Sequence, residues 1–204
     1  MTPVSLTENA PAHHICQYTF WHILMLDNPF RRFVQNPHKM LSGHIRPGMT
    51  VIDIGCGPGT FIGAMAGMAG ENGRVIAIDL QEEMLSHAQE KCRKNTSGAP
   101  ITWHQCMPDS LGITTEADFA LSFYMVHEVP DLARFFREVF RCLKPSGRYL
   151  IVEPVFHVSN AAFNRTLDAA KQAGFTVQKH PPLPLSRTVI LKKEDCRILD
   201  EVIG

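Results

Sequence analysis

The sequence lacks an excess of charge of either sign, because its 20 lysines and arginines are balanced by 20 aspartates and glutamates. Proteins that bind nucleic acid normally carry a basic surplus that neutralises phosphates. The ten histidines add positive charge only at mildly acid pH. The composition therefore predicts no nucleic-acid partner.

Long apolar runs are also missing. No run approaches the roughly 18 to 20 residues that cross a bilayer, and no basic segment precedes a hydrophobic one near the N-terminus. The six cysteines show no C-x-x-C spacing, which favours free thiols in a reducing compartment over a disulfide framework or a zinc site. We expect a cytoplasmic protein with no membrane segment and no metal.

With 204 residues, 45% of them apolar, the chain is long enough for one domain with a full core. We expect residues 1–204 to form that domain. Residues 1–45 show short helical patterns at 15–26, 29–34 and 38–44, and an α/β pattern follows over 46–192.

The most informative stretch lies at residues 51–61. An apolar run at 51–54 predicts a buried strand, and the small-residue segment at 60–70 predicts a helix. Between them stand Gly55, Gly57 and Gly59, as expected of a tight turn whose backbone lies close to a ligand. The helix start beyond this turn offers free N–H groups to an electron-rich ligand.

A second strand at 74–78 ends on Asp79, where a carboxylate is placed to accept hydrogen bonds from a ribose. The dinucleotide pattern G-x-G-x-x-G would need a glycine where Thr60 stands, and the Gly-Lys-Ser/Thr of the phosphate-binding loop is absent. A nicotinamide oxidoreductase is therefore disfavoured, and another nucleoside ligand is expected.

The pattern D-x-G-x-G-x-G over 53–59, followed by Asp79, resembles the cofactor site of class I S-adenosylmethionine (SAM) dependent methyltransferases. Segments 118–131 and 143–154 resemble the family's fourth and fifth strands with their loops, and the resemblance is greatest to the methyltransferase type 11 group, which includes the ubiquinone/menaquinone enzymes. It covers about residues 40–192.

The resemblance implies a Rossmann-like three-layer α/β sandwich, with a mostly parallel seven-stranded sheet that ends in an antiparallel hairpin and helices on both faces. The remaining periodic segments fit this fold: helices at 81–94, 131–143 and 159–173, and strands at 101–106, 175–179 and 188–192. A turn is expected at 95–100, and segment 143–154 is expected to hold a helix end, a turn and the fifth strand.

The resemblance also implies that SAM is the cofactor and S-adenosylhomocysteine (SAH) the product. Residues of the glycine turn and the ends of the next strands would hold it: Asp53, Gly55, Cys56, Gly57, Gly59, Asp79, Leu80, Met84, Met107, Ser122 and Phe123. Many members have Gly-Asp-Ala where this chain has Cys106-Met107-Pro108, so adenine would be held by backbone groups, by apolar contact, or by Asp109.

For catalysis, His127 is the best-placed imidazole to act as a general base, and Tyr124 is the second candidate. His127 could instead fix the local turn, and Tyr124 could line the methyl pocket. Glu153 and His157 are weaker candidates for substrate contact.

We expect a small-molecule methyl acceptor and a monomer or homodimer. Three alternatives stay open: a protein or RNA substrate, a SAM-binding protein without transferase activity, and a soft substrate such as arsenite held by Cys16, Cys106 and Cys142.

Overall fold

A computed structural model describes residues 36–93 and 98–194. The helices predicted at 15–26 and 29–34 lie outside these residues, as does most of the predicted N-terminal extension. The part of that extension within the described residues forms a short helix, α3 (Pro37–Leu41), which ends three residues before the predicted boundary.

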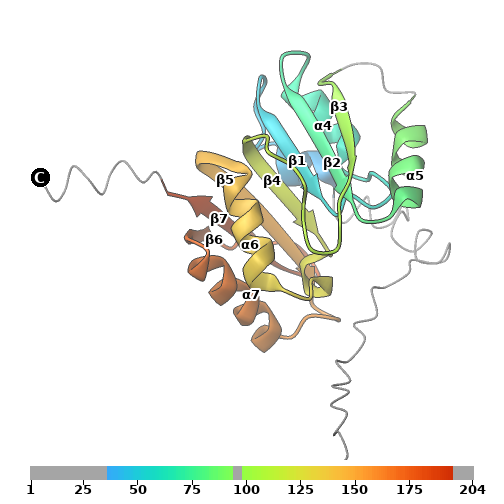
Figure 1. The fold of residues 1–204 in the computed structure, drawn as a ribbon. Helices are drawn as coiled ribbons and strands as arrows, with labels where there is room; N and C mark the ends of the chain where they lie inside the picture. The colour runs from blue at the N-terminus through green and yellow to red at the C-terminus, as the bar shows by residue number, and fades with distance from the viewer. Residues whose placement is uncertain (1–35, 94–97, 195–204) are drawn as a thin grey trace, which may run out of the picture.

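One seven-stranded sheet forms the centre of the molecule (Figure 1), with the strand order β3-β2-β1-β4-β5-β7-β6. Its strands are β1 (Thr50–Ile54), β2 (Arg74–Asp79), β3 (Ile101–Gln105), β4 (Ala117–Phe123), β5 (Leu143–Pro154), β6 (Phe175–Lys179) and β7 (Ser186–Lys193). The first five are parallel, whereas β7 runs antiparallel to both β5 and β6. The predicted fold class and the C-terminal hairpin are confirmed.

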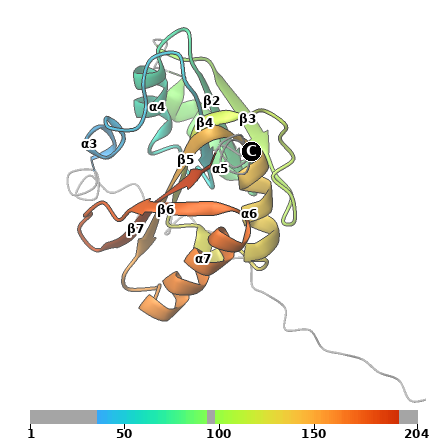
Figure 2. The ribbon, with the colours of Figure 1, turned by 90° about the vertical axis from the view of Figure 1, so that its left-hand side faces the viewer.

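Helices cover both faces of the sheet, as Figure 2 shows. On one side lie α3, α4 (Ile62–Ala69) and α5 (Glu82–Cys92); on the other lie α6 (Leu132–Arg141) and α7 (Asn160–Gln172). Side chains of the central strands alternate between the two faces. Ile52 and Ile76 join the core beneath α6 and α7, while Val51 and Val75 join the opposite core.

Local sequence explains where two of these helices begin and end. Asp131 accepts a hydrogen bond from the backbone N–H of Arg134 at the start of α6, and Ser159 does the same for Ala162 at the start of α7. Gly174, with a φ of 103°, follows the end of α7. These boundaries agree with the predicted ones.

The turn predicted within segment 143–154, ahead of the fifth strand, lies inside β5. Ala117 of β4 pairs with Leu143, but Phe119 pairs with Arg148, so β5 carries extra residues between the two pairs. Ser146 within this bulge has a φ of 63°. The turn residues therefore distort the strand without ending it.

The connection between β3 and β4, residues 106–116, contains no helix. It is anchored to α6, because Glu138 Oε2 accepts hydrogen bonds from the backbone N–H of Leu111 at 2.5 Å and from Ser110 Oγ at 3.3 Å. This connection forms one wall of the main cavity.

Candidate functional site

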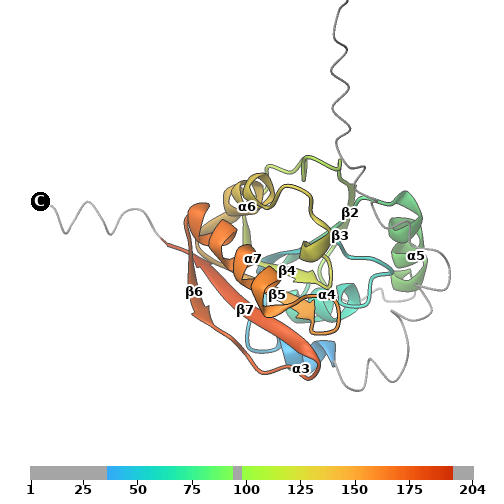
Figure 3. The same ribbon diagram turned by 90° about the horizontal axis from the view of Figure 1, so that it is seen from below.

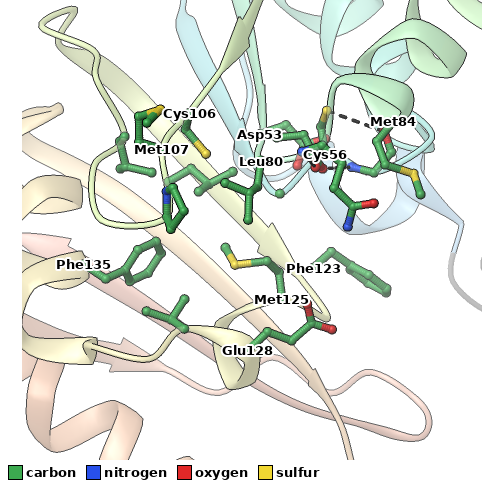
Figure 4. Close-up of a pocket in the computed structure, with 18 of the residues that line it drawn as sticks. Asp53, Cys56, Leu80, Met84, Cys106, Met107, Phe123, Met125, Glu128 and Phe135 are labelled. Atoms are coloured by element: carbon green, nitrogen blue, oxygen red, sulfur yellow. Dashed lines mark hydrogen bonds between the residues drawn. The ribbon is translucent and has the colours of Figure 1, made fainter. Parts of the chain in front are cut away.

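A cavity of about 290 Å³ lies at the carboxyl ends of the parallel strands. Its lining comes from the glycine turn, the ends of β2 and β4, the β3–β4 connection, the 3-10 helix η1 (Val126–Glu128) and α6. Figure 3 views this edge of the sheet, and Figure 4 shows the lining side chains. Most of the labelled side chains in Figure 4 are apolar, so the cavity favours a ligand with large apolar surface.

The glycine turn is held by β2. The N–H groups of Gly55 and Cys56 donate to Ile78 O, and the N–H of Gly57 donates to Asp79 Oδ2 at 2.8 Å. Gly55, Cys56 and Gly57 line the cavity. Gly59 does not: its φ is +75°, and a Cβ there would lie 2.8 Å from Ala88 Cβ of α5. Gly59 therefore serves the packing of the turn onto α5.

Gly55 is required by a neighbouring side chain. A Cβ at this position, where φ is +72°, would lie 2.5 Å from Met125 Cγ. Met125 lines the cavity and lies between the turn and η1 in Figure 4. Gly55 therefore makes room for Met125, and it also lines the cavity, so its closeness to a ligand stays a prediction.

Asp79 is buried at the cavity wall, and both of its carboxylate oxygens accept backbone hydrogen bonds, Oδ2 from Gly57 and Oδ1 from Gln81 at 2.9 Å. Burial raises the pKa of Asp79, and these hydrogen bonds oppose the rise. Each carboxylate oxygen has a second lone pair, so Asp79 can still accept from a ribose hydroxyl.

Asp53 is 1% exposed, and its Oδ2 has no hydrogen-bond partner among the described residues although it lies at the cavity. Burial, together with the nearby charge of Asp79, raises the pKa of Asp53 to about 8. A buried acceptor without a donor is costly. A ligand that brings a donor or a positive charge to this end of the cavity would satisfy it, and the amino and sulfonium groups of SAM fit that requirement.

The adenine-side candidates Leu80, Met84 and Met107 line the cavity. Met107 is 66% exposed, and its backbone pairs with Ser110 in an isolated bridge. Asp109 also lines the cavity, and it forms an ion pair with Arg134 at 3.3 Å. These residues could therefore offer an adenine ring apolar contacts and one carboxylate, which is already paired with Arg134.

Ser122 is fully buried and does not line the cavity. Its Oγ donates to Ile54 O at 3.1 Å and accepts from Tyr149 Oη at 2.7 Å. Ser122 thus ties β4 to its two neighbours, β1 and β5.

Phe123 and Tyr124 line the cavity where β4 ends, with their rings stacked at a centroid distance of 4.3 Å. Tyr124 has a φ of 59°, which is uncommon for a bulky residue. Its hydroxyl lies 2.8 Å from Ser186 Oγ at the start of β7. Because Ser186 Oγ donates to Pro184 O, the Tyr124 hydroxyl donates to Ser186.

His127 is held by Glu153, the buried residue near the end of β5. Its backbone N–H donates to Glu153 Oε1 at 3.2 Å, and Nδ1 lies 2.5 Å from Oε2. Burial lowers the pKa of His127, but the hydrogen bond and charge of Glu153, with Glu128, outweigh burial and raise it. His127, Glu153 and His157 do not line the main cavity, so the end of β5 faces a different space from the other four strand ends.

Several cavity residues were not predicted. Met125 and Glu128 come from the η1 segment, and Arg134, Phe135 and Glu138 come from α6. The helical spacing of Phe135 indicates a core position, and this residue serves both the core and the cavity. The sequence signal that could have identified Arg134 and Glu138 is their spacing of four residues, which places both on one face of α6.

The predicted cysteine trio is only partly described. Cys106 lines the cavity, whereas Cys142 is buried in the core with its thiol 3.6 Å from Ile113 O, and Cys16 lies outside the described residues. Burial raises the pKa of the Cys106 and Cys142 thiols to about 11. Within residues 36–93 and 98–194, no group of three potential ligands could hold a metal ion, and no helix could span a membrane.

Comparisons with known proteins agree with this architecture. Residues 45–201 match the model of the family described as "Methyltransferase domain". A SAM dependent methyltransferase from Aquifex aeolicus has a similar structure, with a TM-score of 0.76, 25% identity, and coverage of 87% of this chain and all of that one.

Curated relatives include a ubiquinone/menaquinone biosynthesis C-methyltransferase of Cronobacter sakazakii, 29% identical over 59% of this chain and 49% of the relative. A 2-phytyl-1,4-naphtoquinone methyltransferase of Synechococcus elongatus is 32% identical over 53% of this chain and 47% of the relative. The chain thus spans about half the length of these relatives. Since the family model covers most of the described residues, the chain belongs to the methyltransferase domain family, with the class I fold and the S-adenosylmethionine cofactor of that family.

Proposed function

We propose that the chain transfers the methyl group of SAM to a small-molecule acceptor and releases SAH. The observation that carries this proposal is the largely apolar cavity between the glycine turn and α6, with the buried, unpartnered Asp53 oxygen at one end. The balanced net charge disfavours a polyanionic substrate. The named relatives act on quinone-type small molecules by their descriptions, which supports this class of acceptor.

The cofactor would be held by the residues of the turn and the neighbouring strand ends. Asp53, Cys56 and Gly57 would hold its methionine part, and Asp79 its ribose. Leu80, Met84 and Met107 would contact adenine. When bound, SAM supplies a methyl group on an electron-poor sulfonium.

The work left to the protein is alignment and exclusion of water, because methyl transfer from a sulfonium is an in-line displacement. Phe123, Tyr124 and Met125 would supply the apolar wall where β4 ends. The hydrogen bond from Tyr124 to Ser186 supports a positioning role for this tyrosine.

His127 is the proposed general base for an acceptor that must lose a proton. A neutral His127 with its proton on Nδ1, donated to Glu153, leaves Nε2, which lies 3.9 Å from Glu128 Oε1, without a proton and able to accept one. The acceptor would then approach from the side of Glu153 and His157. If His127→Ala retained full turnover with normal SAM affinity, His127 would not be the base.

Calorimetric titration with SAM, SAH and NAD tests the cofactor assignment. We expect SAM and SAH to bind and NAD not to bind. Asp79→Ala should weaken SAM binding roughly 10- to 150-fold, the loss of a hydrogen bond to a charged group. Glu116→Ala, an exposed carboxylate outside the cavity lining, is the matched control. Binding of NAD alone, or of none of the three, would contradict the proposal.

Transfer of labelled methyl from SAM in fractionated cytoplasmic extracts distinguishes the alternatives. Label in the small-molecule fraction supports the proposal, while label in protein or RNA supports a macromolecular substrate. SAM affinity without any labelled product would favour a SAM-binding protein without transferase activity. Light scattering on the same preparation would tell whether the proposed monomer or homodimer is correct.

A further inference from the structure

A second hollow lies at the same edge of the sheet, beside the cofactor cavity. It is a groove between α7, the segment 180–185 and the start of β7. Its apolar surface comes from Phe163, two leucines and three prolines. Its polar groups come from Asn160, Asn164, His180, Ser186, Arg187 and Thr188. Among the described residues that line it there is no carboxylate, so the groove is apolar with a cationic end.

Arg187 is incompletely paired. Its Nε donates to Asn160 Oδ1 at 2.9 Å, but its Nη1 is buried without an acceptor among the described residues. The residue opposite Arg187 on β5 is Glu153, whose carboxylate oxygens accept from His127. A guanidinium cannot lose its charge, and an unsatisfied buried donor is costly. The groove is therefore short of an anionic acceptor.

The groove adjoins the cofactor cavity. Ser186 lines the groove, Tyr124 lines the cavity, and their hydroxyl oxygens are 2.8 Å apart. A small molecule seated in the groove could reach the end of β4 across this hydrogen-bonded pair.

We propose that this groove binds the carboxylate end of a small, largely apolar acid, with Arg187 as its cationic contact. A planar carboxylate matches the fork of a guanidinium. A phosphate dianion would call for further cations, and Arg187 is the one arginine or lysine among the described lining residues. That this acid is the methyl acceptor rests on the proposed function, whereas the carboxylate site itself does not.

The test uses benzoate as the probe and benzamide, its neutral analogue of similar shape, as the control. In the full-length ¹⁵N-labelled protein, millimolar benzoate should shift the Arg187 Nε–H signal and the amides of Asn160 and Phe163, and benzamide should not. Arg187→Gln should weaken benzoate binding about tenfold or more. Arg165→Gln changes an exposed arginine of α7 that lies outside the groove, and it should leave benzoate binding unchanged.

A second variant tests the proposal independently if Arg187→Gln fails to fold. Asn160→Asp keeps Arg187 but supplies it with an internal carboxylate at the first residue of α7, where negative charge favours the helix. It should abolish benzoate binding. The proposal is overturned by equal binding of benzamide, by undiminished binding in Arg187→Gln or Asn160→Asp, or by the lack of saturable shifts in the groove. Calorimetry with SAM on the same samples separates the two proposals, because benzoate binding without SAM binding would uphold the groove and refute methyl transfer.

Discussion

Asp53 and Asp79 are two carboxyl groups in one buried wall, and they differ in their partners. Asp79 is satisfied by two backbone N–H groups, while Asp53 keeps an unpartnered oxygen. The electrostatic cost of burying these two carboxyl groups therefore falls mainly on Asp53.

The raised pKa of Asp53 predicts a pH-dependent stability. Between its ordinary value of 3.8 and about 8, the folded protein retains a proton that the unfolded chain releases. The free energy of unfolding should therefore fall as the pH rises through this window. Asp53→Asn removes this dependence. The free energy of unfolding of the variant, relative to that of the wild-type protein, should therefore rise by on the order of 2 kcal/mol or more across the window. Urea unfolding at a series of pH values measures the difference, and a constant difference would contradict the prediction.

The pairing of His127 with Glu153 predicts a second titration effect. Glu153→Gln removes the negative charge, so the pKa of His127 should fall. The contribution of this pair to stability should be complete below the ordinary pKa of histidine and should be lost as the pH rises through the raised one. The His127 Hε1 resonance reports the pKa, and His87, an exposed histidine of α5, is the internal control. An unchanged His127 titration would refute the assignment of its raised pKa to Glu153.

The elements around the cavity are held by a few specific contacts. The β3–β4 connection has no helix of its own, and its position depends on Glu138 and Arg134 of α6. On the opposite side of the cavity, the glycine turn depends on its close packing against α5.

Glu138→Ala should release the β3–β4 connection. We expect faster hydrogen exchange at the amides of residues 107–112, a loss of about 1–3 kcal/mol in stability, and weaker SAM binding. Glu116→Ala, an exposed carboxylate in the same connection, should change none of these. Unaltered exchange at the Leu111 amide would show that Glu138 does not anchor the connection.

Gly59→Ala tests the packing of the turn. Gly57 and Gly59 both have a positive φ, but only at Gly59 would a Cβ clash, since the Cβ position at Gly57 faces open space. Both alanine variants should lose about 1–2 kcal/mol from backbone strain, and Gly59→Ala should lose roughly 1–3 kcal/mol more. Chemical denaturation of the pair isolates the clash. Equal losses would mean that α5 moves to accommodate the methyl group.

In the molecule as a whole, two hydrophobic cores share one sheet. Phe136 lies in the core under α6 and α7, while Trp103 of β3 packs against the opposite core. Because the strands between them are common to both cores, unfolding should be cooperative.

Phe136→Ala tests this cooperativity. The ring is fully buried against Tyr149 and Phe175, so its loss should cost about 3–5 kcal/mol. In a Trp21→Phe background, Trp103 fluorescence and circular dichroism should report one transition, shifted equally by the substitution. A Trp103 transition that stays at its original midpoint would indicate two independently unfolding halves.

The amino-acid sequence determined most of the strands and helices and the part of the cavity wall around the glycine turn, because these depend on local patterns. The buried run at 51–54, the turn around Gly57, Asp79 at the end of β2 and the Asp131 and Ser159 caps can each be identified from a few neighbouring residues. The fold could also be predicted, because these segments resemble those of a known family and the family resemblance implies the arrangement of the sheet.

The tertiary structure alone decided which side chains meet. Contact of Met125 with Gly55, of Glu138 with Leu111, and of Tyr124 with Ser186 joins residues far apart in the sequence. Ser122 lies in β4 and His127 follows that strand, yet the direction of each side chain keeps both out of the cavity: His127 turns to Glu153 and Ser122 to Tyr149. Such directions depend on the packing of neighbouring strands and helices, for which the local sequence has no signal.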